Sequence, residues 1–127
     1  MTNVILDASA LLTLLQNEPG AAAVAEMLPK AAISAVNMAE VVTKLVKKTG
    51  DPRMVVSKLR LLNLRVLPWD ESAAYRSGEI ARLADKGLSL GDRACLTQAI
   101  ISNAMAATAD RSWKDFQQIS DRVILIR

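Results

Sequence analysis

The chain has 127 residues, of which 51% are hydrophobic, and a formal net charge of +3; this is the size of one domain with a buried core. It contains no histidine and one cysteine, which excludes a histidine-ligated zinc site, a Ser-His-Asp triad and an intramolecular disulfide. Two tryptophans, one tyrosine and one phenylalanine leave few rings on which the bases of a single-stranded nucleic acid could stack.

The amino terminus indicates neither secretion nor membrane insertion. No basic segment precedes the first apolar run, and Asp7 interrupts that run. No stretch approaches the roughly 18 uncharged apolar residues that a membrane span needs. We therefore expect a cytoplasmic protein with no membrane partner.

Short apolar runs alternate with helical patterns along residues 1–127, as in strand–helix units that wind into a parallel sheet. The pattern predicts a single domain of the α/β class. The expected strands are Val4–Leu6, Ala32–Ser34, Arg65–Leu67, Met105–Thr108 and Val123–Ile126.

Helix start and stop signals divide the segments between these strands. Ser9, Ser34 and Asp70 are expected to cap helices, and Pro52 fits a first-turn position. The predicted helices cover residues 9–17, 20–28, 34–48, 52–62 and 70–84, and a last one begins at Ser89 or Gly91 and runs to 103. At turns or helix starts we expect four solvated acids: Asp51, Asp70, Asp85 and Asp121.

Two further acids follow predicted strands, Asp7 after the first and Asp110 after the fourth. The chain leaves each parallel strand at its carboxyl end, where open α/β sheets bind ligands, so the two acids share one sheet edge if their strands are neighbours. Ser9 and Thr108 lie two residues from these acids and can face the same crevice. Each acid has an alternative role in a turn or a helix cap.

Asp92 and Glu40 are carried on predicted helices. Helical spacing places Asp92 in line with the buried stripe that includes Cys95, and such a charge either stabilises the helix amino end or serves a site. Glu40 has Lys44 four residues further on, so spacing alone favours an exposed Glu-Lys pair. Cys95 itself is expected to be inert packing.

These four acids, Asp7, Glu40, Asp92 and Asp110, are far apart in the sequence and can meet only in the folded chain. Their repulsion would then have to be offset by bound cations, and carboxylate oxygens suit hard divalent ions. The sequence therefore contains a candidate metal site.

Five segments form a pattern across essentially the whole chain: Val4–Leu12, Asn17–Gly20, Ser34–Val41, Leu88–Ala94, and Thr108–Arg111 with Trp113. In this order and spacing they resemble PIN-domain ribonucleases. Within that family, the chain looks most like the VapC toxins of prokaryotic toxin–antitoxin pairs.

The resemblance implies a five-stranded parallel sheet in the order 3-2-1-4-5, flanked by helices. It implies a site for one or two Mg²⁺ or Mn²⁺ ions, with Asp7, Glu40, Asp92 and Asp110 as metal ligands and catalytic residues. It gives supporting roles to Ser9, Asn37 and Thr108, of which Asn37 is expected to orient Glu40 or a metal-bound water. For Glu40 the resemblance replaces the exposed-pair interpretation.

The expected activity is hydrolysis of RNA phosphodiester bonds by water that a metal ion activates, which leaves a 5′-phosphate and a 3′-hydroxyl. Arg93, Arg111 and Lys114 lie near the proposed acids in sequence. They either hold flanking phosphates or are ordinary solvated cations.

Other functions have specific requirements. A phosphorylation-dependent receiver needs paired acids after the first strand, and a haloacid-dehalogenase-type phosphatase needs an aspartate two residues after Asp7, where Ser9 stands. A PIN fold that binds RNA without cutting it is disfavoured by the full acid set. A stand-alone RNA-processing nuclease remains the main alternative to a toxin.

The expected partners are RNA, a second copy of the chain in a homodimer, and a small antitoxin. The helices over residues 10–17 and 36–48 carry more apolar side chains than one helix face needs, and such a surplus can form a groove for a partner segment. The predicted groove residues are Leu11, Leu12, Leu15, Val42, Leu45 and Val46.

Overall fold

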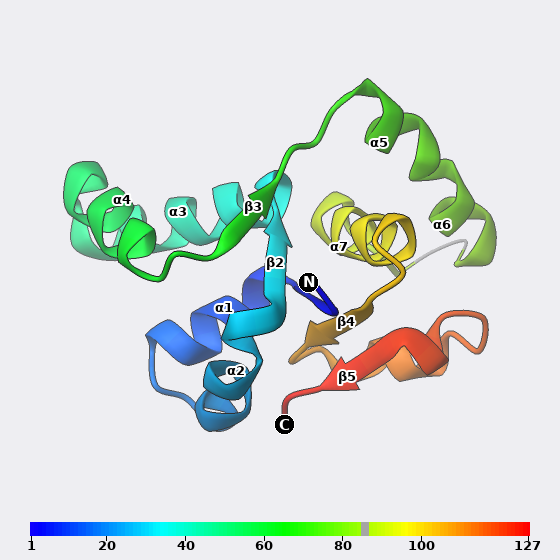
Figure 1. Ribbon diagram of the computed structural model, residues 1–127, viewed down its shortest axis with the longest axis horizontal. Coiled ribbons are helices and arrows are strands. Elements are labelled where there is room, and N and C mark those ends of the chain that lie inside the picture. The colour runs from blue at the N-terminus through cyan, green and yellow to red at the C-terminus, as the bar shows by residue number, and fades with distance from the viewer. Residues whose placement is uncertain (85–86) are drawn as a thin grey trace.

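The computed structural model describes residues 1–84 and 87–127. It contains five strands, β1 (Val4–Leu6), β2 (Ala31–Ser34), β3 (Arg65–Leu67), β4 (Met105–Thr108) and β5 (Val123–Leu125). All neighbouring strands pair in parallel, in the order β3-β2-β1-β4-β5 (Figure 1). The predicted α/β fold and strand order are confirmed; β2 starts one residue earlier than expected and β5 ends one residue earlier.

The segments between the strands are mainly helical. The α-helices are α1 (Ala8–Leu15), α2 (Ala21–Met27), α3 (Ala35–Thr49), α4 (Pro52–Leu61), α5 (Glu71–Arg76), α6 (Gly78–Leu83) and α7 (Leu90–Ile101). Short 3-10 turns cover η1 (Leu28–Lys30), η2 (Arg111–Asp115) and η3 (Ser120–Arg122).

The helix boundaries differ from the sequence-based expectation in two places. The predicted helix over residues 70–84 is divided at Ser77, whose hydroxyl donates to the carbonyl of Ala74 at 2.6 Å. The first helix is capped by Asp7 and not by Ser9, because the Asp7 carboxylate accepts from the backbone N–H of Ala10. The Ser34 cap is confirmed.

The acids expected at turns behave as predicted where the structure describes them. Asp51 and Asp70 are exposed and cap α4 and α5. Asp121 is exposed in η3. Asp85 lies outside the described residues.

Both faces of the sheet are covered by helices, which explains why the central strands are continuous apolar runs. In β1, Ile5 packs on one face in a cluster that includes Leu96 of α7. Val4 and Leu6 point to the other face and pack with Val24 of α2. Helix α3 contacts both α1 and α7, so it links the two helical layers (Figure 1).

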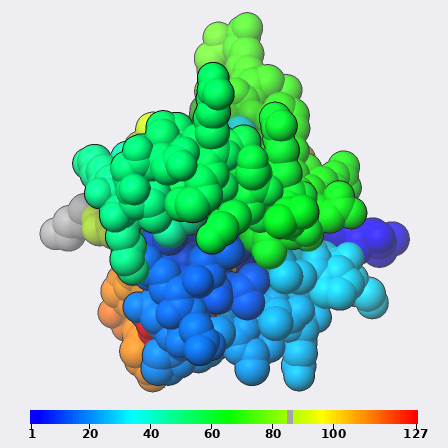
Figure 2. Space-filling model, turned by 90° about the vertical axis from the view of Figure 1, so that its left-hand side faces the viewer, coloured from blue at the N-terminus to red at the C-terminus, as the bar shows by residue number. Residues whose placement is uncertain are grey.

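Apolar hollows lie beside α3 and α4, which form the surface above α1 and α2 in Figure 2. The larger measures about 430 Å³ and is lined by Met38, Val42, Val56, Leu59, Arg60, Asn63, Leu64 and Val66. A smaller one of about 180 Å³ includes Leu15 and Leu45. The prediction of the groove residues is therefore wrong in part, because Leu11 and Leu12 are buried in the core. The other four predicted residues stay partly exposed: Leu15, Val42, Leu45 and Val46.

Among the described residues, no helix combines the length and the apolar composition needed to cross a membrane.

Candidate active site

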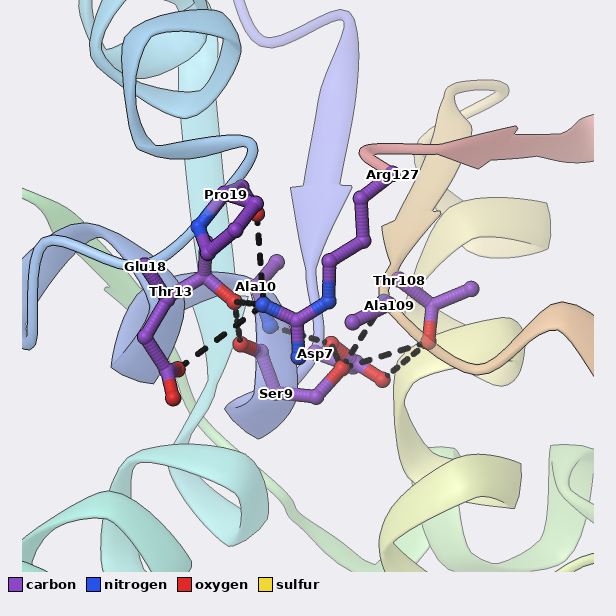
Figure 3. A network of polar contacts seen from close by, with 9 residues as sticks. All are labelled: Asp7, Ser9, Ala10, Thr13, Glu18, Pro19, Thr108, Ala109 and Arg127. Atoms are coloured by element: carbon purple, nitrogen blue, oxygen red, sulfur yellow. Dashed lines mark hydrogen bonds and ion pairs between the residues drawn. The ribbon is translucent and has the colours of Figure 1, made fainter.

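Asp7 lies directly after β1, the central strand, and is 4% exposed. Its Oδ1 accepts hydrogen bonds from the Ala10 N–H at 2.8 Å and the Ser9 hydroxyl at 2.7 Å, and its Oδ2 accepts from the Thr108 hydroxyl at 2.6 Å (Figure 3). The Asp7 N–H donates to the carbonyl of Ala107 in β4 at 3.0 Å. Because β1 and β4 are neighbours, the fold holds this carboxylate between two strand ends.

The surroundings of Asp7 disfavour its charged form. Burial is the main cause that raises the pKa of this carboxyl, and the negative charge of Asp92 raises it further. Hydrogen bonds from Thr108, Ser9 and Ala10 oppose that shift without cancelling it. A cation placed beside Asp7 would therefore relieve an unfavourable interaction.

Asp92 has the first of the two roles that its position in the sequence left open, stabilisation of the helix amino end. Its Oδ2 accepts from the Ser89 N–H at 3.0 Å, while the Ser89 hydroxyl accepts from the Asp92 N–H at 3.1 Å. This reciprocal capping box stabilises the amino end of α7. The negative charge of the same carboxylate also contributes to the raised pKa of Asp7.

Glu40 points toward α7 and not toward Lys44. Its Oε1 accepts from the side-chain amide of Asn37 at 3.1 Å, and the same amide nitrogen donates to the carbonyl of Gly91 at 3.0 Å. The ion pairs between described residues are Arg76–Glu79 and Glu18–Arg127. The exposed Glu40–Lys44 pair that spacing favours does not form among them.

The buried thiol of Cys95 is influenced by three of the predicted acids. Its side chain is fully buried, with the Sγ atom 3.7 Å from the carbonyl of Ile5. Burial raises the pKa of the thiol well above its ordinary value, and Asp7, Asp92 and Glu40 raise it further. Contact geometry places the Glu40 carboxylate of α3 against Gly91, which precedes Asp92 in the first turn of α7.

Asp110 joins this group indirectly. Its backbone N–H donates to the Thr108 hydroxyl at 3.0 Å, while its Oδ1 caps η2 by accepting from the N–H and the hydroxyl of Ser112 at 3.0 and 2.7 Å. Within residues 1–84 and 87–127, no three acidic side chains form a group close enough to hold one metal ion. Asp7 and Asp110 thus follow the ends of two neighbouring parallel strands, and the four predicted acids do not form a closed set of ligands.

The chemistry of the donors fits a hard divalent cation such as Mg²⁺ or Mn²⁺. Glu40, Asp92 and Asp110 each use one carboxylate oxygen in the hydrogen bonds described above. The buried Oδ1 of Asn37 has no hydrogen-bond partner among the described residues. Oxygen atoms therefore remain for a cation and its water molecules.

The three predicted phosphate-binding cations all contact backbone carbonyls. Arg93 donates to Leu88, Arg111 to Arg127 and Lys114 to Ser120, at 3.0, 2.9 and 3.0 Å. Arg111 and Lys114 are exposed and Arg93 is half-buried. These bonds fix the direction of each side chain and leave further N–H groups for a ligand.

Sequence reasoning missed two residues that support the acids, Ser112 and Gly91. Ser112 binds the Asp110 carboxylate, and the pattern Asp-x-Ser is a local signal for such a turn. Gly91 lies against Glu40. Its signal was a glycine in the first turn of a helix, where glycine is intrinsically unfavourable.

Several solved structures share the fold over nearly the full length of both chains. A toxin–antitoxin complex from Klebsiella pneumoniae is 19% identical over 98% of each chain, with a TM-score of 0.77. DNA-bound VapBC from Salmonella typhimurium is 20% identical over 100% of each chain, with a TM-score of 0.75. VapBC2 from Rickettsia felis, bound to a promoter DNA fragment, is 18% identical over 98% of each chain, with a TM-score of 0.73.

Comparison with curated proteins gives no match. The sequence profile of the PIN domain matches residues 4–119, which include all four acids and the whole of β1 to β4. The chain therefore belongs to the PIN domain family.

Proposed function

We propose that this protein is an Mg²⁺- or Mn²⁺-dependent endoribonuclease of the cytoplasm and the toxin of a toxin–antitoxin pair. The main support is the buried Asp7 carboxylate at the end of the central strand, which three hydrogen bonds hold in place. The Glu40 carboxylate also lies against the first turn of α7, which carries Asp92. Membership of the PIN domain family and the likeness to solved toxin–antitoxin complexes add to it.

Each residue has a defined part in this proposal. Asp7, Glu40, Asp92 and Asp110 hold the cation, which when bound supplies activation of water and charge neutralisation at the phosphate. Ser9 and Thr108 fix the Asp7 oxygens, and Asn37 fixes Glu40. The flanking phosphates of the RNA contact Arg93, Arg111 and Lys114. Because water attacks, the products carry a 5′-phosphate and a 3′-hydroxyl.

The antitoxin is proposed to bind beside α3 and α4. The hollow of about 430 Å³ there is mainly apolar, with Arg60 at its rim. The segment 44–60 carries six cations and a single acid, Asp51, a larger excess than the net charge of +3 of the whole chain. An amphipathic acidic segment of a small protein would match this surface in both respects.

A homodimer is also proposed, because large apolar side chains remain exposed outside this hollow. Leu61 is 84% exposed, Tyr75 75% and Leu90 56%. Covering such side chains in a symmetric interface is the usual solution for oligomers of identical chains.

Cleavage of end-labelled RNA tests the proposed activity. We expect cutting in Mg²⁺ or Mn²⁺ and none in EDTA, with 5′-phosphorylated products. Asp7→Asn should abolish it, whereas Asp121→Asn, at an exposed acid in η3, should keep it. Undiminished cleavage by Asp7→Asn would show that the proposed active site is wrong.

The toxin assignment has its own test. A gene directly upstream that encodes a small protein with a DNA-binding amino half, and a complex between the two products, would support it. An active nuclease without such a partner would instead be a stand-alone RNA-processing enzyme.

A further inference from the structure

Gly91 occupies a position where the backbone does not require glycine. It is buried in the first turn of α7 and does not have a positive φ. Any L-residue can adopt this conformation, and alanine favours a helix more than glycine does. The reason for glycine must therefore lie outside the helix.

That reason is the carboxylate of Glu40. A Cβ atom added at Gly91 would lie 2.1 Å from Oε1, 2.7 Å from Cδ and 3.0 Å from Oε2 of Glu40. These are its three nearest neighbours, and all belong to one side chain from another helix. The volume of a side chain at position 91 is thus already filled by the Glu40 carboxylate.

Asn37 connects the two residues by a second, independent contact. Its amide nitrogen donates both to Glu40 Oε1 and to the Gly91 carbonyl, at 3.1 and 3.0 Å. Asn37 is 1% exposed, so this amide has little freedom to follow a carboxylate that moves. Displacing Glu40 would therefore break the hydrogen bond that orients it.

We propose that Gly91 is a positioning residue for the acidic cluster, because only a residue without a side chain lets the Glu40 carboxylate lie against the first turn of α7. The part of this inference that concerns metal binding rests on the proposed function. The colliding group is the end of a flexible side chain and not backbone, so a methyl group at position 91 displaces Glu40 and leaves the fold intact.

Gly78 supplies a matched control. It also lies in the first turn of a helix, α6, without a positive φ. A Cβ atom there would meet nothing within 4 Å. The variants are G91A, G78A, E40A and the double variant G91A/E40A, each made in the full chain.

The first measurement needs no metal. The side-chain amide signals of Asn37 in the ¹H–¹⁵N spectrum report its two hydrogen bonds. We expect G91A to shift these signals much as E40A does, and the double variant G91A/E40A to show little further shift beyond that of E40A. The melting temperature of G91A should equal or exceed that of the parent. G78A should leave these signals unchanged. Unshifted Asn37 signals in G91A would overturn the proposal.

The second measurement is the affinity for Mn²⁺ by calorimetry. G91A should weaken it by roughly 10- to 100-fold, as expected when a group that orients a ligand is lost, whereas G78A should not. An unchanged affinity in G91A would overturn the metal-binding part. If the parent bound no Mn²⁺ while the Asn37 signals behaved as expected, the positioning of Glu40 would stand and the proposed metal-dependent function would fail.

Failure of G91A to fold has a defined meaning as well. The double variant G91A/E40A removes the collision, so it should restore folding if Glu40 is the obstacle. An unfolded double variant would show that Gly91 is needed for another packing reason, and the proposal would be overturned.

Discussion

Asp7 illustrates how one residue can meet structural and chemical demands together. Through Oδ1 it caps α1, and through Oδ2 it accepts from Thr108 at the end of β4. Neither hydrogen bond requires a full negative charge, because asparagine also caps helices well. The chain nevertheless places a carboxyl group where burial and the charge of Asp92 raise its pKa, which is expected of a group that serves a cation.

Replacing that charge should not weaken the metal-free protein. Asp7→Asn keeps an oxygen for the cap and removes a buried charge, so its free energy of unfolding in EDTA should equal or exceed that of the parent. Asp7→Ala loses the cap and should be less stable than Asp7→Asn by about 1 kcal/mol. Urea denaturation measures both. Equal destabilisation of the two variants would show that the charge itself supports the fold.

Cys95 should make stability fall in alkaline solution. In the fold its pKa is raised well above 9.0 by burial and by the nearby acids, so above the ordinary thiol pKa only the unfolded chain loses this proton. Stability is unaffected below that value and falls as pH rises toward the folded pKa. At neutral pH the free energy of unfolding of Cys95→Ala should be about 1 kcal/mol lower than that of the parent. This difference between the two proteins should become smaller by about pH 10, because only the parent loses stability through the thiol. A constant difference in urea denaturation would contradict this.

At the scale of elements, α7 depends on the residues around its first turn. The capping box of Ser89 and Asp92 stabilises the helix end, and the same turn brings Asp92 and Gly91 to the acidic cluster. A defect in the cap therefore affects both the stability of the helix and the position of its acid.

Ser89→Ala should reduce the free energy of unfolding by about 1 kcal/mol, because the Asp92 N–H loses its acceptor. Ser89→Thr should retain most of the stability, since threonine also caps. Ser57→Ala, at an exposed position within α4, serves as the control and should change little. Thermal unfolding distinguishes these outcomes, and a threonine variant as unstable as the alanine variant would show that the cap is not the cause.

Most elements were predictable because their signals are local. The strands follow from short apolar runs, and the Ser34 and Asp70 caps follow from residue type and position. The capping of α1 by Asp7 instead of Ser9 does not follow from residue type, because aspartate and serine both cap helices well. The direction of Glu40 and the need for Gly91 arise from contact between α3 and α7. No local pattern encodes a contact between segments so far apart in the chain.

At the scale of the whole molecule, the large apolar side chains that stay exposed among the described residues lie mostly on helices, and one of them lies on the edge strand β3. Val66 of β3 is 45% exposed and lines the larger hollow. The lining of that hollow includes none of the four acids.

The proposed homodimer should be visible without any partner. Sedimentation at micromolar concentration is expected to give the mass of two chains, since exposed residues such as Leu61, Tyr75 and Leu90 would otherwise stay in water. A single species of 13.7 kDa would contradict the dimer.

A divalent ion should stabilise the folded chain, because the acids proposed to hold it come together only there. Mn²⁺ at about 100 times its dissociation constant should add about 2.7 kcal/mol to the free energy of unfolding. The gain should disappear in Asp7→Asn and persist in Asp121→Asn. An equal gain in both variants would mean that the ion binds elsewhere.

The hydrogen bond between Asp7 and Thr108 joins residues 101 positions apart, and this separation bears on synthesis. While the ribosome makes the chain, β1 and α1 emerge first, but β4 follows only after α7. Long-range strand pairing of this kind cannot begin until both partners have left the exit tunnel. A nascent chain therefore carries Asp7 without the hydroxyl that fixes it, and the acids at the ends of β1 and β4 cannot come together until β4 has emerged.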